Sequence, residues 1–149
     1  MIAIKQSTKT KGEIAETFVL ANLIQNGFTV SIPYGENSRY DFIVETKTGL
    51  KKIQVKYIGK HKGKKYFQFP LRSIRANKKQ NKIKYYTVKE IDFMVGYCTE
   101  NKGCYIIPME DLKTKHEIHI WIDQKPKGKN QFNPIDPEKY KNNWELLNK

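Results

Sequence analysis

Three polar side chains with complementary chemistry fall on one predicted β-hairpin, Asp41 on its first strand and Gln54 and Lys56 on its second. A four-residue turn between the strands pairs Glu45 with Leu50. In that register Asp41 lies opposite Gln54, and Lys56 follows two residues further along the same face. The alternating apolar side chains point the other way, toward the core: Phe42, Val44, Ile53 and Val55. A carboxylate, an amide and an ammonium group therefore converge on one face of the hairpin.

This combination can bind a hard divalent cation and hydrolyse a phosphodiester. Mg²⁺ takes oxygen ligands, with one or two carboxylates and the rest from carbonyls and water. Four groups can supply such a shell: the Asp41 and Glu16 carboxylates, the Gln54 side-chain oxygen and the Val55 backbone carbonyl. Lys56 would orient the attacking water or counter the negative charge that develops on the phosphate. Polar residues alternate on many half-exposed strands, so a solvent-facing hairpin is the alternative interpretation.

The positive charge of the chain is concentrated in one segment. The formal net charge is +13, and residues 61–90 carry ten Lys or Arg against a single acid, Glu90. Such a density repels itself unless a polyanion is the partner. Nucleic acid is the natural candidate, because each neutralised phosphate releases a condensed counterion. Aromatic side chains interleave the cations, so we expect a folded DNA-contact segment over about residues 60–90 rather than a solvated basic face.

The residue types within this segment suggest which side chains would contact DNA bases and which would contact phosphates. Arg72 and Arg75 suit bidentate contacts to guanine, and Gln68 suits adenine. The lysines suit phosphate anchoring: Lys62, Lys64, Lys65, Lys78, Lys79 and Lys82. Which of these side chains reach base edges is left open by the sequence.

Size and composition limit the class of protein. The chain has 149 residues with 18 aromatic side chains, enough for one domain with its own core. No apolar run approaches the ~20 residues that cross a bilayer, and the N-terminus has no signal-peptide pattern. Two cysteines can form neither a disulfide framework nor a zinc site by themselves. We expect an intracellular, cytoplasmic protein without a membrane partner.

The elements that must position the hairpin are predicted in the order helix, strands, helix. Thr10 and Glu13 form a predicted capping box, so Glu16 is the helix carboxylate left for the site. The predicted core stripe of this helix is Ile14, Phe18, Ala21 and Ile24. Strands are predicted over 28–32, 39–45, 51–58, 66–71, 91–98, 104–108 and 117–122, with a basic loop over 72–84. A short helix capped by Asp136 carries Tyr140, Trp144 and Leu147 on one face. The fold class is mixed α/β (α+β), built on a meander.

Three segments resemble motifs of one enzyme superfamily. KGEIAE at 11–16, RYDFIV at 39–44 and IQVK at 53–56 resemble the PD-(D/E)XK nucleases. Within that superfamily the likeness is to the small group I intron homing endonucleases of cyanobacterial type, and more distantly to archaeal Holliday-junction resolvases. The resemblance implies a restriction-endonuclease-like core, with a single domain over 1–149 and a catalytic core over about 11–58. It implies a helix glutamate at Glu16, the motif aspartate at Asp41 and the catalytic lysine at Lys56.

The sequence departs from the superfamily pattern at two positions. Tyr40 stands where proline is common, and that proline is not a metal ligand. Gln54 stands where an acid is usual, so the site would hold its metal with one charge fewer. Glutamine at this position occurs in the homing-endonuclease branch, so the resemblance implies an active enzyme.

The function implied is a site-specific homing DNA endonuclease that uses Mg²⁺, with Mn²⁺ able to substitute. One active site cuts one strand, so a double-strand break needs a symmetric homo-oligomer, a dimer or a tetramer, with the tetramer favoured. Its target would be double-stranded DNA with a long pseudo-palindromic site. A junction-resolving nuclease and a non-catalytic basic nucleic-acid-binding module are the alternatives.

Overall fold

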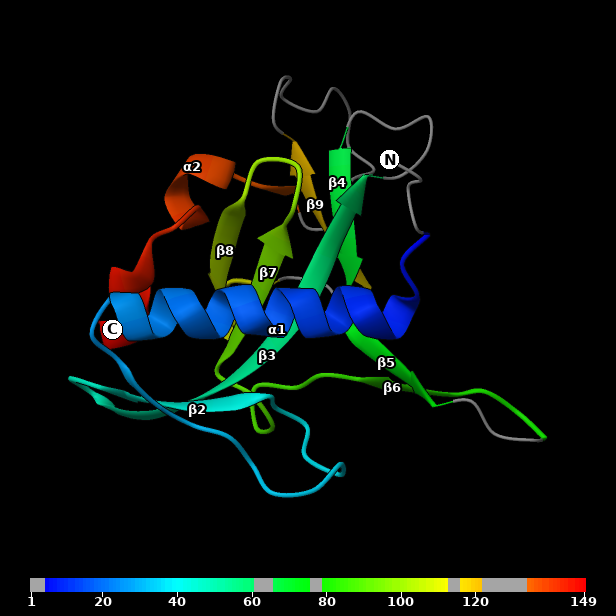
Figure 1. Ribbon diagram of the computed structural model, residues 1–149, viewed down its shortest axis with the longest axis horizontal. Helices are drawn as coiled ribbons and strands as arrows, with labels where there is room; N and C mark the ends of the chain where they lie inside the picture. Colours follow the sequence, from blue (N-terminus) through cyan, green and yellow to red (C-terminus); the bar gives the residue numbers. More distant parts are fainter. Residues whose placement is uncertain (1–4, 61–65, 76–78, 113–115, 122–133) are drawn as a thin grey trace.

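The computed structural model describes residues 5–60, 66–75, 79–112, 116–121 and 134–149 (Figure 1). The helical elements are α1 (Thr8–Gln25), η1 (Met109–Asp111), α2 (Pro137–Tyr140) and η2 (Trp144–Asn148). The strands are β1 (Thr29–Ser31), β2 (Phe42–Thr46), β3 (Gly49–Lys60), β4 (Tyr66–Pro70), β5 (Arg72–Arg75), β6 (Lys82–Tyr85), β7 (Phe93–Cys98), β8 (Gly103–Pro108), β9 (Glu117–Trp121) and β10 (Pro134–Ile135). None of the helices in these ranges is long and apolar enough to cross a membrane.

The sheet is organised around β3, whose 12 residues pair with three other strands. Gly49–Ile53 pair antiparallel with β2, Ile53–Ile58 pair parallel with β7, and Gly59 and Lys60 pair antiparallel with β4. β8 extends the sheet beyond β7, while β9 and β10 extend it beyond β4. The expected order of a long helix, a mixed sheet and a short C-terminal helix is confirmed. The predicted simple meander is wrong, because β3 and β7 are parallel neighbours in the sheet although β4, β5 and β6 lie between them in the sequence.

The β2–β3 hairpin has the predicted register. Glu45 is the partner of Leu50, and Phe42 is the partner of Ile53. The four apolar side chains predicted to face the core are all buried: Phe42, Val44, Ile53 and Val55. The opposite face of the hairpin is therefore the one that presents Asp41, Gln54 and Lys56.

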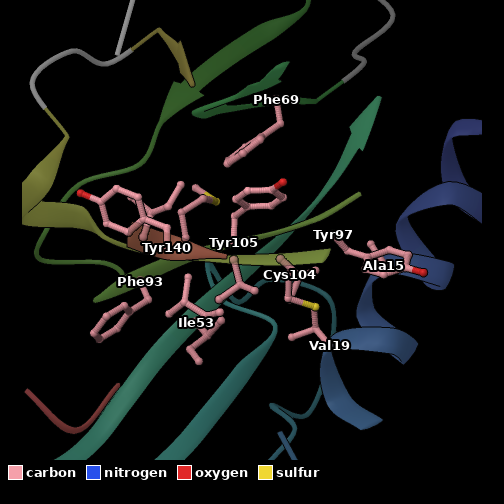
Figure 2. Packing of buried hydrophobic residues seen from close by; sticks show 14 of the residues in the cluster. Ala15, Val19, Ile53, Phe69, Phe93, Tyr97, Cys104, Tyr105 and Tyr140 are labelled. Atoms are coloured by element: carbon pink, nitrogen blue, oxygen red, sulfur yellow. The ribbon is translucent and has the colours of Figure 1, made fainter. Parts of the chain in front are cut away.

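Helix α1 lies across the sheet and buries a different stripe from the predicted one. Its buried residues are Ala15, Val19 and Leu23, at a regular spacing of four. Figure 2 shows Ala15 and Val19 facing Tyr97 and Cys104 of the sheet. The predicted stripe is wrong for Phe18, which is 45% exposed and stacks on Tyr97 at the helix edge, and for the exposed Ala21 and Ile24.

The helix also begins earlier than predicted. Its N-cap is Ser7, whose hydroxyl accepts a hydrogen bond from the Thr10 amide at 3.1 Å. The predicted capping box is therefore wrong, and Glu13 lies within the helix rather than at its end. Ser7 competes successfully with Thr10 because it too is a good N-cap residue.

The segment predicted as a basic loop contains two strands. β5 and β6 pair antiparallel, from Arg72 opposite Tyr85 to Arg75 opposite Lys82. They form a separate two-stranded sheet, which we call the arm, and it projects from the body of the molecule (Figure 1). The alternation of apolar and polar residues that predicts a strand is weak in this lysine-rich segment, because its aliphatic residues within β5 and β6 are the exposed cross-strand pair Ile74 and Ile83.

The C-terminal segment is a single α-turn followed by a 3₁₀ turn rather than one short helix. Asp136 caps α2 by accepting a hydrogen bond from the Glu138 amide at 3.1 Å, as predicted. Tyr140, Trp144 and Leu147 are all buried, although they belong to two separate elements.

Gly96 on β7 provides a test of this packing. A Cβ added there would lie 2.5 Å from Cδ1 of Ile58 and 2.9 Å from Cε1 of Phe69. Gly96→Ala should lower the free energy of unfolding by about 1–3 kcal/mol, because overpacking forces buried side chains out of their rotamers. Urea unfolding measures the change.

The matched control is Gly12→Ala on α1, where no described atom lies within 4 Å of the added methyl group. Alanine is the better helix former, so this variant should gain about 0.5–1 kcal/mol. Equal stability of the Gly96→Ala protein and the wild type would contradict the packing around β7.

Candidate active site

Asp41 stands where β2 separates from β3. Its backbone N–H still donates to the Ile53 carbonyl at 2.8 Å. Beyond this point the Asp41 side chain, rather than the backbone of β2, is the hydrogen-bonding partner of β3. Asp41 Oδ2 accepts hydrogen bonds from the Val55 N–H at 2.7 Å and from Gln54 Nε2 at 2.6 Å. The structure thus brings Asp41 and Gln54 together as the hairpin register requires.

The Val55 carbonyl lies on the same open edge of β3. Backbone groups two residues apart face the same side of a strand, so Val55 faces the side on which Ile53 meets Asp41. The Val55 oxygen accepts a hydrogen bond from Gln54 Nε2 at 3.1 Å. The nitrogen of the Gln54 amide, rather than the expected oxygen, therefore faces the site. A half-turn of the amide would present its oxygen instead.

Glu16 and Asp41 line one groove between α1 and the segment that precedes β2. We call it the acidic groove, since four carboxylates contribute to its wall: Glu13, Glu16, Glu36 and Asp41. Glu13 was assigned a capping role by the sequence and instead lies one helical turn before Glu16. Glu16, Thr17 and Leu20 line the groove from α1, and Asp41 and Phe42 line it from the hairpin.

The two central carboxyl groups are held in an environment that disfavours their charge. Burial raises the pKa of Asp41, while the Val55 amide and the Lys56 ammonium act in the opposite direction. Partial burial in the groove wall raises the pKa of Glu16, and the charges of Asp41 and Glu13 raise it further. The Asp41 charge therefore disfavours ionisation of Glu16, and a cation between the two carboxylates would relieve this effect.

The donor set fits a hard divalent cation. Glu16, Asp41 and the Val55 carbonyl supply oxygen atoms, and the Asp41 hydrogen bonds to described residues both end on Oδ2. No three His, Cys, Asp or Glu side chains cluster as a metal site within the described ranges. Two carboxylates with a carbonyl and water match the preference of Mg²⁺ better than that of zinc.

Lys56 is half-buried and contacts an aromatic ring that the sequence analysis missed. Its ammonium nitrogen lies 5.0 Å from the centroid of the Tyr86 ring. Burial lowers the pKa of Lys56, the charge of Asp41 raises it, and the Arg39 guanidinium lowers it. Lys56 is therefore close enough to Asp41 for the two charges to interact, as a shared site requires.

Arg39 is the second residue that the sequence analysis did not identify as functional. Its Nε contacts Glu90 Oε1 at 3.2 Å, its Nη1 donates to Ser73 Oγ at 2.7 Å, and its Nη2 donates to the Tyr85 carbonyl at 2.9 Å. Its guanidinium carbon also lies 4.3 Å from the centroid of the Tyr86 ring. These partners are 34 to 51 residues away in sequence, so only the fold reveals them.

The predicted DNA-contact residues divide into three groups. Lys62, Lys64, Lys65 and Lys78 lie outside the described residues, and only the backbone of Arg75 is described, in β5. Gln68 and Arg72 are partly buried on β4 and β5. Lys79 and Lys82 are exposed.

Lys82 also lines a second depression, which runs along the arm. We call it the basic cleft, and it is lined by Asn37, Arg39, Ser73, Lys82, Ile83 and Lys84. The segment 37–41 thus contributes Ser38 and Asp41 to the acidic groove and Asn37 and Arg39 to the basic cleft. An acidic and a basic depression therefore lie on either side of one short segment.

Comparisons with known proteins identify the family and the fold. The sequence model of a family described as PD-(D/E)XK endonuclease matches residues 6–143. Among solved structures, the chain is similar to a bacterial homing endonuclease, I-Ssp6803I, with 26% identity and a TM-score of 0.79. The match covers 95% of this chain and 93% of that one, so the restriction-endonuclease-like fold is confirmed. No curated protein matches significantly.

The raised pKa of Asp41 predicts how stability depends on pH. A carboxyl group whose folded-state pKa is raised stabilises the fold while protonated, and this contribution is lost as pH rises through that pKa. Asp41→Asn should therefore become more stable relative to the wild type as pH rises from about 4 to about 7 in metal-free buffer. Urea unfolding over this pH range measures the difference.

Asp111→Asn is the control of opposite sign. The Tyr140 hydroxyl donates to Asp111 Oδ2 at 2.6 Å, and this hydrogen bond and the Lys139 ammonium lower the pKa of Asp111. Asp111 therefore stabilises the fold when ionised, so its asparagine variant should lose stability relative to the wild type as pH rises from about 2 to about 4 and change little above that range. The same pH trend in both variants would contradict the environment described for Asp41.

Proposed function

This chain belongs to the PD-(D/E)XK endonuclease family, and from that premise we propose that it is a site-specific DNA endonuclease of the homing type. It would hydrolyse one phosphodiester bond in each strand with a divalent cation, Mg²⁺ or Mn²⁺, and leave a double-strand break. The observation that carries the proposal is the Asp41 side chain on the open edge of β3, with Glu16 in the same groove. The solved structure similar to this chain is described as a bacterial homing endonuclease, which supports the homing role.

The residues of the acidic groove would hold the cation. Asp41 and Glu16 supply the charge and the Val55 carbonyl supplies a neutral ligand, while Gln54 must turn its amide to present oxygen. When bound, the cation supplies a more acidic water and neutralises charge at the phosphate. Because Gln54 is neutral, the site has one carboxylate fewer than it would have with an acid at position 54. We therefore expect weaker metal binding and no loss of the site.

Lys56 supplies the positive charge that the reaction needs beside the cation. Its ammonium group sits on the same face of β3 as Gln54 and interacts with Asp41. Directed at the reacting phosphate, it would orient the attacking water and stabilise the negative charge that builds on the phosphoryl oxygens. Partial burial strengthens this interaction, because water screens the charge less.

The arm and the basic cleft would bind the DNA backbone. Lys82 is exposed at the end of the arm away from the body, and the Lys84 side chain is 64% exposed although its ammonium contacts Glu90. A two-stranded β-ribbon has the width to enter the major groove of B-DNA. We therefore place phosphate contacts in the basic cleft and base contacts on the arm, with Arg72 and Arg75 as readers of guanine.

A double-strand cut requires more than one copy of the chain. Two subunits related by a two-fold axis would place one acidic groove on each strand and would recognise a pseudo-palindromic site. We propose a tetramer in which two subunits brace the pair that contacts DNA.

The function is tested by selecting targets from a plasmid library that carries randomised duplex segments. With Mg²⁺, the wild-type protein should linearise a recurrent pseudo-palindromic class of site, recovered by sequencing the cut ends. Lys56→Ala and Asp41→Asn should each lower the single-turnover cleavage rate by at least about 10²-fold, the size expected when a charge-stabilising group is removed. DNA binding measured with Ca²⁺ should persist in Lys56→Ala.

Lys51→Ala is the matched control, since Lys51 is on the same strand and its ammonium contacts the C-terminal carbonyl of Lys149. It should cleave at the wild-type rate. Two outcomes would overturn the proposal: cleavage of four-way junctions with linear duplexes left intact, or DNA binding by the wild type without any cleavage in Mg²⁺ or Mn²⁺.

The backbone contacts of the basic cleft are tested by salt dependence. Lys82→Ala should reduce the slope of log affinity against log salt by about one, on selected and random duplexes alike. Lys47→Ala is the control, because Lys47 is equally exposed but lies at the β2–β3 turn, away from the arm (Figure 1). An unchanged slope for Lys82→Ala, or an equal change for Lys47→Ala, would exclude the cleft from DNA contact.

A further inference from the structure

Tyr86 directly follows the arm and lies between two cationic side chains. Its side chain is buried, with 7% of the residue exposed. The Arg39 guanidinium carbon lies 4.3 Å from the ring centroid and the Lys56 ammonium nitrogen 5.0 Å from it. Both distances are within the range over which an aromatic ring attracts a cation. The ring therefore connects a residue of the hairpin motif with the lysine assigned to the reaction.

Lys56 depends on this ring for its orientation. In the described part of the chain its ammonium group forms no ion pair and no hydrogen bond, and the Tyr86 ring is its contact partner. A lysine side chain has four rotatable carbon–carbon bonds and loses much entropy when it is held. A half-buried ammonium without such a partner would sample several rotamers, most of them directed away from Asp41.

The position of the ring is set by the arm. The Tyr86 N–H donates to the Leu71 carbonyl at 3.2 Å, immediately before β5, and Tyr86 follows the last residue of β6. Arg39 clamps the same region through Ser73 on β5 and the Tyr85 carbonyl on β6. Glu90 completes the clamp by contacting Arg39 at 3.2 Å and Lys84 at 3.1 Å.

We propose that Tyr86 is a positioning residue of the nuclease site, whose ring holds the Lys56 ammonium beside Asp41 and couples it to the base of the arm. The role of the ring rests on the proposed function only in what Lys56 does once it is held. The aromatic face is what contacts Lys56, whereas the Tyr86 hydroxyl interacts with Ser73 of the arm, so the face alone should hold the lysine. Phenylalanine keeps the face, whereas leucine removes it and keeps most of the bulk.

The first test needs neither DNA nor metal. In protein labelled with ¹³C-lysine, the Lys56 ε-methylene protons should resonate upfield of the other lysines because they lie over the Tyr86 ring. Lys56→Arg identifies the signal by its disappearance. The upfield shift should persist in Tyr86→Phe and vanish in Tyr86→Leu. A wild-type Lys56 signal at the position of exposed lysines would overturn the proposal, and this result requires no variant of Tyr86 to fold.

The second test separates positioning from binding. On duplex recovered from the plasmid library, Tyr86→Leu should lower the single-turnover cleavage rate by about tenfold or more, because small misplacements of a reacting group are costly. Its DNA affinity in Ca²⁺ should stay within about threefold of the wild type, a small change on the affinity scale. Tyr86→Phe should restore the rate. Equal impairment of the phenylalanine and leucine variants, or a loss confined to affinity, would overturn the proposal.

Tyr57→Leu is the matched control. Lys11 lies over the Tyr57 ring with its ammonium 5.6 Å from the centroid, so this variant removes a second lysine–tyrosine pair that no part of the proposed reaction uses. It should cleave at the wild-type rate. Should the wild type cleave no DNA at all, the proposed function fails, and the NMR shift alone decides whether Tyr86 holds the lysine.

Discussion

The hydrogen bond from the Val55 N–H to Asp41 Oδ2, at 2.7 Å, is the interaction on which the site depends. β2 leaves β3 at this point, and the amide of a buried residue would otherwise lose its partner at a cost of about 1–3 kcal/mol. The carboxylate satisfies the amide, and this hydrogen bond favours its charge, but burial of the carboxyl group outweighs it and raises the pKa. The Val55 carbonyl lies on the same edge, where it accepts a hydrogen bond from the Gln54 amide. The need to satisfy the Val55 amide at the edge of the sheet thus places the Asp41 carboxylate beside the Val55 carbonyl, and these oxygen atoms are the kind that a hard cation binds.

The second organising feature is the joint between the body and the arm. Arg39 is two residues before Asp41, yet its contacts reach β5, β6 and Glu90. Hydrogen bonds that carry a charge and are partly buried are among the stronger polar contacts in proteins. The segment that carries Asp41 is therefore attached to the segment proposed to hold DNA. The groups proposed to bind and to cut DNA are thus connected through Arg39, and Tyr86 contacts both Arg39 and Lys56.

The sequence was sufficient for the hairpin because a short turn and strict alternation determine its register. Glu45 pairs with Leu50, and Asp41 meets Gln54, as that rule requires. It was insufficient where two patterns compete or partners are distant. Ser7 and Thr10 are both acceptable caps, and α1 offers two overlapping apolar stripes, of which the sheet accepts the one with Ala15. The arm and the Arg39 contacts depend on residues far apart in sequence, so no local sequence pattern predicts them.

The central claim is that Asp41, Glu16 and the Val55 carbonyl form one divalent-cation site at the open edge of β3. Anomalous diffraction from crystals of the protein grown with Mn²⁺ tests it most directly, since the peak locates the ion without reference to activity. The account predicts a peak in the acidic groove within about 2.5 Å of oxygen atoms from Asp41 and the Val55 carbonyl, with Glu16 coordinating directly or through water. A bound ion elsewhere, with this groove empty at saturating Mn²⁺, would contradict it.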